Sequence, residues 1–175
     1  VPSDLYRFVS DVKDKPEIKV NGAAIDYRIE KGYAVIKRQW KKGDVMEMNL
    51  PMEVKRVTAH QNIIESKGKV ALERGPLVYC IEGVDNYGKS SNIILPSDAI
   101  LTVEHKPTLL NGITVLTADL PSILISENGQ SITTQKRTVT AIPYYAWANR
   151  EQSEMVIWLP EKVKDVDLLA VDVKK

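Results

Sequence analysis

Apolar and polar residues alternate with a period of two through much of the chain, in short runs separated by turn residues. In Gly68–Glu82, Val70 and Leu72 alternate with polar or small neighbours. Gly75-Pro76 then interrupts the run, and Leu77–Ile81 follows as a stretch that is apolar on both faces. A period of two is typical of a strand with one solvated face, and a continuous apolar run is typical of a strand covered on both faces. The pattern predicts a β-hairpin whose second strand is buried.

The part of the chain ahead of this hairpin is predicted to be a series of shorter hairpins. Asn21-Gly22 and Lys31-Gly32 are turn signals, because the tight turns of hairpins need residues that tolerate positive φ. We find no helical stripe of useful length. The strands predicted here cover residues 17–20, 25–30, 33–40, 45–50 and 54–59.

After Glu82 the regular alternation of apolar and polar residues stops. Residues 83–92 are polar and rich in turn formers, so they are the best candidate for a linker or a long loop. Asn111-Gly112 and Asn128-Gly129 predict two further turns, and 163–175 is expected to be an edge strand or a tail. Short strands with turns at this spacing indicate an all-β, antiparallel sandwich with little helix. We expect two small packed sandwich lobes, residues 1–84 and 85–175. Later strands are predicted at 101–105, 113–118, 123–126, 138–142, 145–148 and 155–159.

Composition and charge argue against several classes of function. The 175 residues include 24 basic and 23 acidic side chains, which gives a net charge of +1. Binding to nucleic acid or to an anionic membrane needs a clustered basic surface, so neither is expected as a partner. The single cysteine excludes an internal disulfide and a cysteine-based metal site. The chain does not begin with methionine, so we expect a fragment.

Few residues suggest catalysis. Glu73, Glu82 and Asp85 are candidate paired carboxylates for glycosidic chemistry, but exposed acids at strand edges are common. Cys80 lies within an apolar run, which favours a small buried hydrophobe over a nucleophile. His60 and His105 have no paired spacing, and we expect them to be surface residues rather than metal ligands. No catalytic residue, metal site or cofactor is predicted.

The aromatic cluster in Pro143–Arg150 is the strongest candidate for binding. Tyr144, Tyr145 and Trp147 lie within four residues and could stack on sugar rings. Aromatic side chains also dominate cores and interfaces, so packing against another lobe or an absent partner is favoured over sugar binding. If residues 145–148 form a strand, Tyr145 and Trp147 share one face and Tyr144 lies on the other.

A set of motifs in order along the chain resembles a known family. Together they resemble the C-terminal region of the β-L-arabinofuranosidase-like enzymes, glycoside hydrolase family 127 and its relatives, over roughly positions 1 to 160. Single motifs are weak, but the ordered set is specific. The motifs are Val20-Asn21-Gly22, Lys31-Gly32-Tyr33 with Arg38 and Trp40, Lys42-Gly43-Asp44, Leu50-Pro51-Met52, Ala71–Cys80, Leu110–Ile113 and Ile142–Arg150.

The resemblance implies where the chemistry lies. In that family an (α/α)6 barrel carries the zinc site and the cysteine nucleophile and precedes two β-sandwich domains. This chain has one cysteine and no barrel, so no catalytic residue carries over, and Cys80 matches a sandwich position. The family has an earlier sandwich strand, so the first lobe is expected to lack its first strand. The resemblance also implies a periplasmic or extracytoplasmic location.

Three functions remain open from the sequence. The resemblance favours an accessory β-sandwich region of a bacterial glycoside hydrolase that breaks down plant glycans, with the catalytic barrel of the same polypeptide as its partner. The alternatives are a carbohydrate-binding module that uses Tyr144, Tyr145 or Trp147, and an immunoglobulin-like interaction module. Without the barrel we expect an exposed apolar patch, so the chain either self-associates or displays several of its aromatic residues on its largest surface patch.

Overall fold

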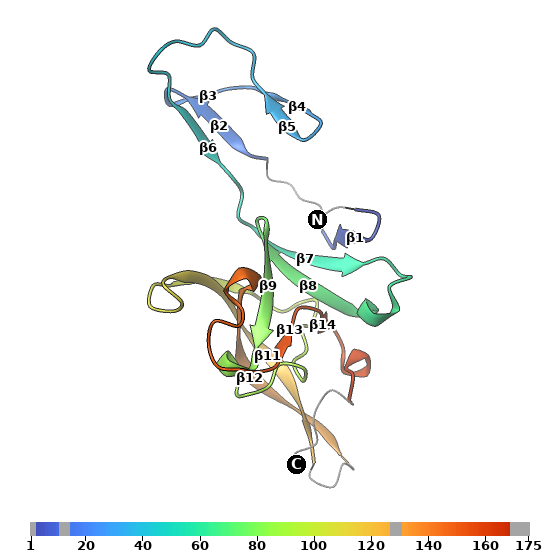
Figure 1. The fold of residues 1–175 in the computed structure, drawn as a ribbon. Helices are drawn as coiled ribbons and strands as arrows, with labels where there is room; N and C mark the ends of the chain where they lie inside the picture. The colour runs from blue at the N-terminus through green and yellow to red at the C-terminus, as the bar shows by residue number, and fades with distance from the viewer. Residues whose placement is uncertain (1–2, 11–14, 127–130, 169–175) are drawn as a thin grey trace. The chain divides into compact units, whose positions relative to one another are not determined.

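The computed structural model describes residues 3–10, 15–126 and 131–168, which divide into two compact units (Figure 1). Unit 1 contains Val1–Asp11 and Glu53–Lys175, and unit 2 contains Val12–Met52. All strand pairs are antiparallel, and the helices among the described residues are 3₁₀ turns of three residues each, so the predicted all-β architecture with little helix is confirmed. None of these helices has the length and apolar character that crossing a membrane requires. They are η1 (Ile64–Ser66), η2 (Gly83–Asp85), η3 (Tyr144–Ala146) and η4 (Val163–Asp165).

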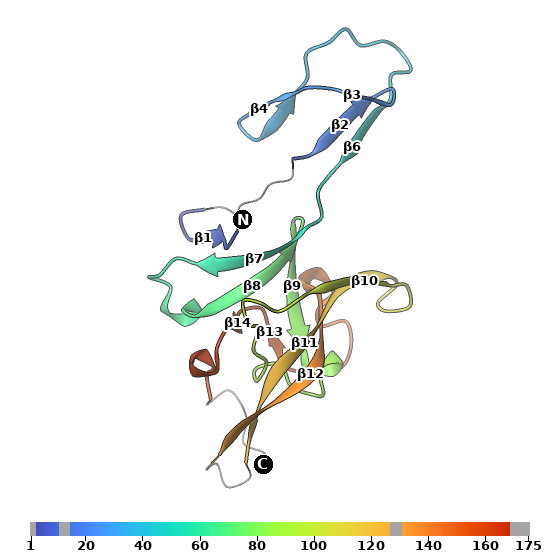
Figure 2. The same ribbon diagram turned by 180° about the vertical axis from the view of Figure 1, so that it is seen from behind.

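Unit 1 is built on one nine-stranded sheet (Figures 1 and 2). Seven strands follow the order β1-β7-β8-β9-β12-β11-β10, while β13 pairs with β9 and β14 pairs with β8. The sheet is therefore continuous through β9, which hydrogen-bonds to β8 on one side and to β12 on the other. The strands are β1 (Tyr6–Phe8), β7 (Val54–Ala59), β8 (Lys69–Arg74), β9 (Leu77–Glu82), β10 (Thr102–Lys106), β11 (Ile113–Ile125), β12 (Ile132–Pro143), β13 (Met155–Val156) and β14 (Leu159–Pro160).

The β8–β9 hairpin confirms the central prediction from the sequence. Its closing pair is Arg74 opposite Leu77, and Gly75-Pro76 makes the turn between them. Gly75 has φ +57°, a left-handed conformation that glycine adopts without steric cost. The hairpin therefore forms where the alternating pattern is broken by these two residues.

Strand β9 is covered on both faces, also as predicted. Tyr79 and Ile81 belong to the main cluster of buried hydrophobic side chains, which includes residues of β8, β11, β12 and β14. Cys80 points to the opposite face and packs in a second cluster with Val115 and Ile142. A strand buried on both faces has no solvated side, which accounts for its continuous run of apolar residues.

The longest hairpin joins β11 to β12 and is more extensive than the sequence predicts. The runs predicted at 113–118 and 123–126 form one continuous strand, and the run predicted at 138–142 extends back to Ile132. The register runs from Leu116 opposite Ala141 to Ile125 opposite Ile132. The turn predicted at Asn128-Gly129 and the last residues of the tail predicted at 163–175 lie outside the described residues.

The division between units differs from the lobes expected from the sequence. The expected boundary between residues 84 and 85 falls within unit 1, because Cys80 of β9 pairs directly with Ile142 of β12. Residues 83–92 do form a loop, but one that is packed within unit 1. Asn86 in this loop is buried and its side-chain amide donates to the carbonyl oxygens of Glu82 and Thr140. A local polar composition therefore does not indicate a linker here.

Unit 2 contains two small sheets, one in the order β3-β2-β6 and one pairing β4 with β5. The two turns predicted from the sequence are confirmed: Asn21 and Gly22 have φ of 53° and 79°, and Lys31 and Gly32 have φ of 50° and 84°. Strand β2 has the predicted extent, whereas β4, β5 and β6 are shorter than the predicted strands that contain them. The strands of unit 2 are β2 (Glu17–Val20), β3 (Ala23–Ala24), β4 (Arg28–Glu30), β5 (Tyr33–Val35) and β6 (Met46–Asn49).

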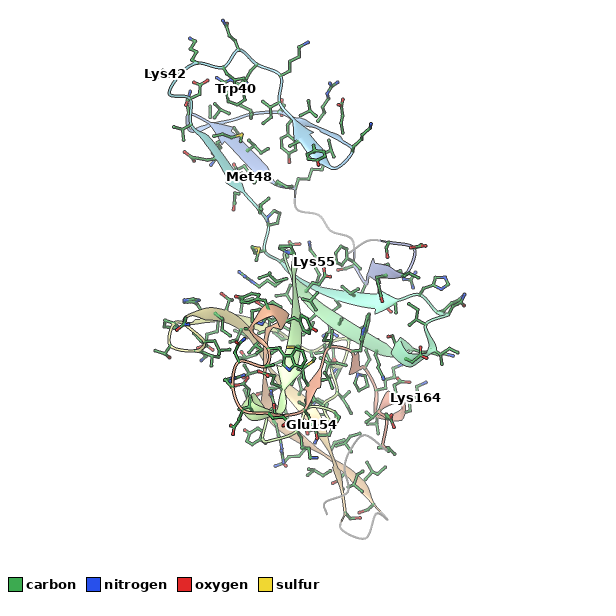
Figure 3. The ribbon with its side chains drawn as sticks, viewed as in Figure 1. Trp40, Lys42, Met48, Lys55, Glu154 and Lys164 are labelled. Atoms are coloured by element: carbon green, nitrogen blue, oxygen red, sulfur yellow. The ribbon has the colours of Figure 1, made fainter. Side chains whose placement is uncertain are left out.

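One face of the β3-β2-β6 sheet is incompletely covered. Met46 and Met48 lie opposite Val20 and Ile18, and directly opposed residues of an antiparallel pair share a face. Ile18 and Val20 are buried, yet Met46 and Met48 are 55% and 58% exposed, and Figure 3 labels Met48. The apolar face of this sheet therefore extends beyond the side chains that cover it within the described residues.

Candidate functional site

The aromatic cluster lies in the loop between β12 and β13, and it is not a strand. Residues Tyr144–Ala146 form η3, and the N–H of Trp147 donates to the carbonyl oxygen of Tyr144 at 3.1 Å. A 3₁₀ turn repeats every three residues, so positions i and i+3 lie on the same side. Tyr144 and Trp147 accordingly stack on each other, with ring centroids 5.7 Å apart and planes 21° from parallel. The faces expected for a strand at 145–148 are therefore wrong.

All three aromatic side chains reach solvent. Tyr144, Tyr145 and Trp147 are 43%, 64% and 38% exposed. Ala146 points the other way, is buried, and packs in the cluster that contains Cys80. The turn thus separates one small inward side chain from three large outward ones. We call Tyr144, Tyr145 and Trp147 the aromatic surface.

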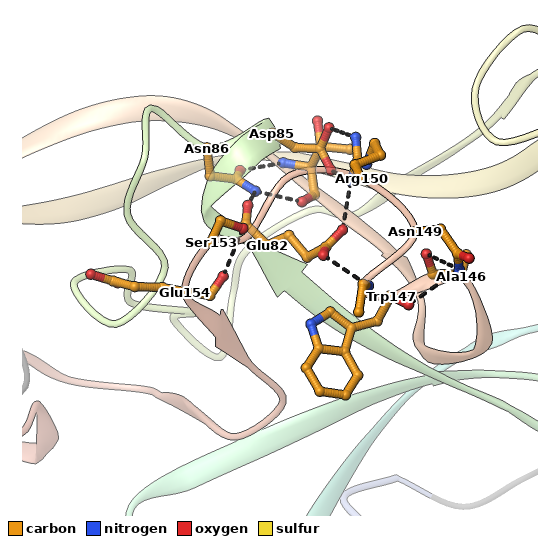
Figure 4. A network of polar contacts seen from close by, with 11 residues as sticks. Glu82, Asp85, Asn86, Ala146, Trp147, Asn149, Arg150, Ser153 and Glu154 are labelled. Carbon is orange, nitrogen blue, oxygen red and sulfur yellow. Dashed lines mark hydrogen bonds and ion pairs between the residues drawn. The ribbon is translucent and has the colours of Figure 1, made fainter.

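An ionic network lies close to Trp147, in the loop that carries the aromatic surface (Figure 4). The guanidinium of Arg150 donates to both carboxylate oxygens of Asp85 and to Oε2 of Glu82, each at 2.6 Å. The Glu82 side chain is 2% exposed, and those of Asp85 and Arg150 are 15% and 20% exposed. A buried carboxylate needs a paired charge and further hydrogen bonds, and Arg150 supplies the charge. The hydrogen bonds with Asp85 hold the pKa of Arg150 above its ordinary value.

The same network fixes the backbone that follows the aromatic surface. Oε1 of Glu82 accepts a hydrogen bond from the N–H of Ala148 at 3.2 Å, and Ala148 has φ +61°. A left-handed conformation is costly for a residue with a Cβ, so it persists only where surrounding contacts enforce it. The side-chain amide of Asn149 donates to the carbonyl oxygens of Ala146 and Trp147. The loop therefore holds one conformation by polar contacts on both sides of Trp147.

A second carboxylate fixes the neighbouring loop. Glu154 accepts hydrogen bonds from the backbone N–H of Ser90, from the Lys89 ammonium and from the Ser91 hydroxyl, at 2.9–3.0 Å. Burial alone would raise the pKa of Glu154, but these donors outweigh it and lower the pKa to about 2. Figures 3 and 4 label this residue. The loop predicted as a linker is thus anchored to the segment just ahead of β13.

The other candidate residues do not assemble into a reactive site among the described residues. Cys80 is buried, and burial raises the pKa of its thiol to about 12, so it stays protonated as predicted for a small hydrophobe. His60 and His105 are both exposed, as expected. Glu73 and Glu82 are buried rather than exposed at strand edges, which corrects the expectation for these acids. No group of three or more potential metal-ligating side chains occurs in the described part of the chain.

A polar groove in unit 1 was not predicted from the sequence. It has a volume of about 550 Å³ and lies between the 96–100 segment and strands β10 to β12. Asp98, Asp119 and Lys136 line it, and the Thr138 hydroxyl donates to Asp119 at 2.7 Å. Its residues come from three separate stretches of sequence, which is why no local motif announced it.

Comparisons with known proteins agree along most of the chain. Residues 54–160 match the family model for the glycoside hydrolase family 127 C-terminal domain, and residues 6–52 match the model for the β-L-arabinofuranosidase GH127 middle domain. The junction between the two matches coincides with the division between unit 2 and the second segment of unit 1. The two divisions agree at this junction, whereas residues 6–11 match the middle-domain model but belong to unit 1 by their contacts.

Relatives in sequence and structure carry related names and are much longer. A non-reducing end β-L-arabinofuranosidase of Bifidobacterium longum is 33% identical over 156 residues, which is 81% of this chain but 23% of that protein. A GH127 β-arabinofuranosidase structure aligns with TM-score 0.87 and 37% identity over 95% of this chain and 26% of its own. A GH127 β-L-arabinofuranosidase from Geobacillus stearothermophilus T6 aligns with TM-score 0.77 and 41% identity over 85% of this chain and 25% of its own.

The chain therefore spans about a quarter of the length of the relatives it matches. The family matches cover both units, and the one to the C-terminal domain alone covers more than half of the chain. The ordered motifs from Val20 to Arg150 indicated the same assignment. These observations identify the chain as a member of glycoside hydrolase family 127, representing its middle and C-terminal β-domains.

Proposed function

We propose that this chain is the non-catalytic accessory region of a β-L-arabinofuranosidase-like glycoside hydrolase that acts on plant glycans. The observation that carries the proposal is the match of unit 2 and unit 1 to the middle and C-terminal domains of the family, within relatives four times as long. The catalytic barrel of the same polypeptide is the partner in this proposal.

The ion pairs and hydrogen bonds of three acidic side chains, Glu82, Asp85 and Glu154, support a non-catalytic role. Glycoside hydrolases commonly use two carboxylates placed on either side of the scissile bond. In this chain Glu82 and Asp85 converge on the guanidinium of Arg150 instead, and Glu154 is saturated by donors from residues 89–91. These acids hold loops in place, which is a structural use of charge.

The uncovered apolar face of unit 2 supports a partner within the parent protein. Met46 and Met48 of β6 are more than half exposed, although Val20 and Ile18, which lie opposite them, are buried. Leu50, just after β6, is 50% exposed. Contiguous apolar surface of this kind marks an interaction site on a soluble protein. In the proposed parent, the catalytic part covers this face and the accessory region braces it.

The test is an assay of the 175-residue chain with a chromogenic β-L-arabinofuranoside, with the Bifidobacterium longum relative as the positive control. We expect no release of chromophore above the buffer blank at enzyme concentrations a thousandfold above those of the control. Turnover that survives further purification would contradict the proposal, since it would place the reacting groups within this chain.

A further inference from the structure

The aromatic surface differs in kind from the apolar face of unit 2. The apolar face of unit 2 exposes the methionines Met46 and Met48 of β6, whereas the β12–β13 loop exposes three aromatic rings within four residues. The residues that follow in this loop, Asn149, Glu151 and Gln152, are polar and exposed. The exposed aromatic side chains are therefore followed directly in the chain by exposed groups that can form hydrogen bonds.

The exposed rings can stack on a ligand that presents C–H groups. The face of an aromatic ring carries partial negative charge and its edge partial positive charge. The C–H groups on one side of a sugar ring are complementary to such a face, and the hydroxyl groups around the ring suit amide and carboxylate partners. Stacking uses one face of Tyr144 and one of Trp147, and both residues still expose part of their surface to solvent.

The surface is also held ready for a ligand. The Glu82 carboxylate fixes Ala148 in its left-handed conformation, and the Glu82–Arg150–Asp85 network closes the loop from behind. Binding sites that are preformed in this way spend little free energy on ordering themselves.

We propose that Tyr144, Tyr145 and Trp147 form a binding surface for a sugar ring of the glycan on which the parent enzyme acts, with Asn149 at its polar border. The choice of a sugar as the ligand rests on the proposed function of the parent. The Glu82–Arg150–Asp85 network positions the loop and does not contact the sugar.

The experiment titrates the chain with β-L-arabinofuranosyl oligosaccharides by calorimetry and by tryptophan fluorescence, up to millimolar sugar. We expect saturable heat and a fluorescence change. Tyr145→Ala and Trp147→Ala should each weaken binding by about tenfold or more. Trp147→Phe keeps a flat ring, so it should retain calorimetric binding while losing the fluorescence response.

Two control variants make the result specific. Tyr33→Ala removes a tyrosine of unit 2 that is 76% exposed, so binding should be unchanged. Asp119→Asn alters the polar groove and should also leave binding unchanged. The proposal is overturned by an absence of heat and fluorescence change, by binding that Asp119→Asn weakens and Tyr145→Ala does not, or by Tyr145→Ala affecting only self-association in sedimentation. Failure to bind leaves the proposed function standing, whereas hydrolysis of the sugar would overturn that function without touching the binding surface.

Discussion

The strands of the two units differ in how completely their apolar side chains are buried. In unit 1, β9 is covered on both faces and its buried neighbours come from strands far apart in the sequence. In unit 2, only Ile18 and Val20 among the described hydrophobic side chains are buried. Turns that the pattern predicts are present in both units, at Gly75-Pro76 in unit 1 and at Asn21-Gly22 and Lys31-Gly32 in unit 2. The comparison shows that correct local structure does not ensure a complete core, which depends on what lies against each sheet.

The largest effect is expected from opening the core of unit 1. Leu116 is 1% exposed in the main cluster, so Leu116→Ala should lower the free energy of unfolding by about 3–4 kcal/mol, from lost burial and the cavity left behind. Urea unfolding followed by circular dichroism measures this. Met48→Ala is the matched change in unit 2 and should cost less than about 1 kcal/mol, because Met48 is 58% exposed. Equal costs for both variants would show that the units do not differ in packing as described.

Breaking the ionic network of Glu82, Arg150 and Asp85 should cause the next largest loss of stability. Arg150→Met keeps much of the volume but leaves Glu82 buried without its charge partner, so we expect a loss of about 2–3 kcal/mol, less than for a fully buried pair because Arg150 is partly exposed. Hydrogen exchange should also rise at residues 144–150. Lys19→Met removes an exposed cation of unit 2 that pairs with Glu17, and its effect should be near zero. A large loss from the Lys19 variant would contradict this ranking.

The smallest expected effect is the loss of stability when Glu154 becomes protonated at low pH. Because the pKa of Glu154 is lowered from 4.5 to about 2, its contribution to stability is fully present above about pH 4.5 and is lost as the pH falls towards 2. Hydrogen exchange at residues 83–92 should therefore rise over this range more steeply than in Glu154→Gln, whose side chain does not titrate. Parallel pH profiles for the two proteins would show that another carboxylate controls this loop. The effect is modest because Glu154 is partly exposed, and solvent screens its interactions.

What could be predicted from the sequence was local. Gly75-Pro76 and Asn21-Gly22 mark their turns because their backbone preferences act within a few residues. The pairing of β9 with β12 was not predictable, since no local preference indicates which of many apolar strands lie side by side. The lobe boundary at 84 and 85 was misplaced for this reason.

The candidate site was predicted in composition but not in geometry. The sequence singled out the three aromatic residues, yet their period suits a strand as well as a 3₁₀ turn, and tertiary contacts selected the turn. Glu82 and Asp85 were noted as acids, while Arg150 was missed as their partner because it lies more than sixty residues away. One signal was available: a glutamate at the end of an apolar, doubly covered strand requires a buried cation.

The insertion of unit 2 between β1 and β7 has a consequence for folding. Strand β1 pairs with β7, so the whole of unit 2 is a loop that must close before Tyr6 can lie opposite Ala59. Each doubling of a flexible loop adds about 0.6 kcal/mol to the entropic cost of closure. Within unit 2, Glu17 lies opposite Asn49, so once β2 and β6 pair, the two ends of the insertion are already side by side. Pairing of β2 with β6 therefore shortens the loop that separates β1 from β7. Substitutions that weaken this pairing should also weaken the pairing of β1 with β7.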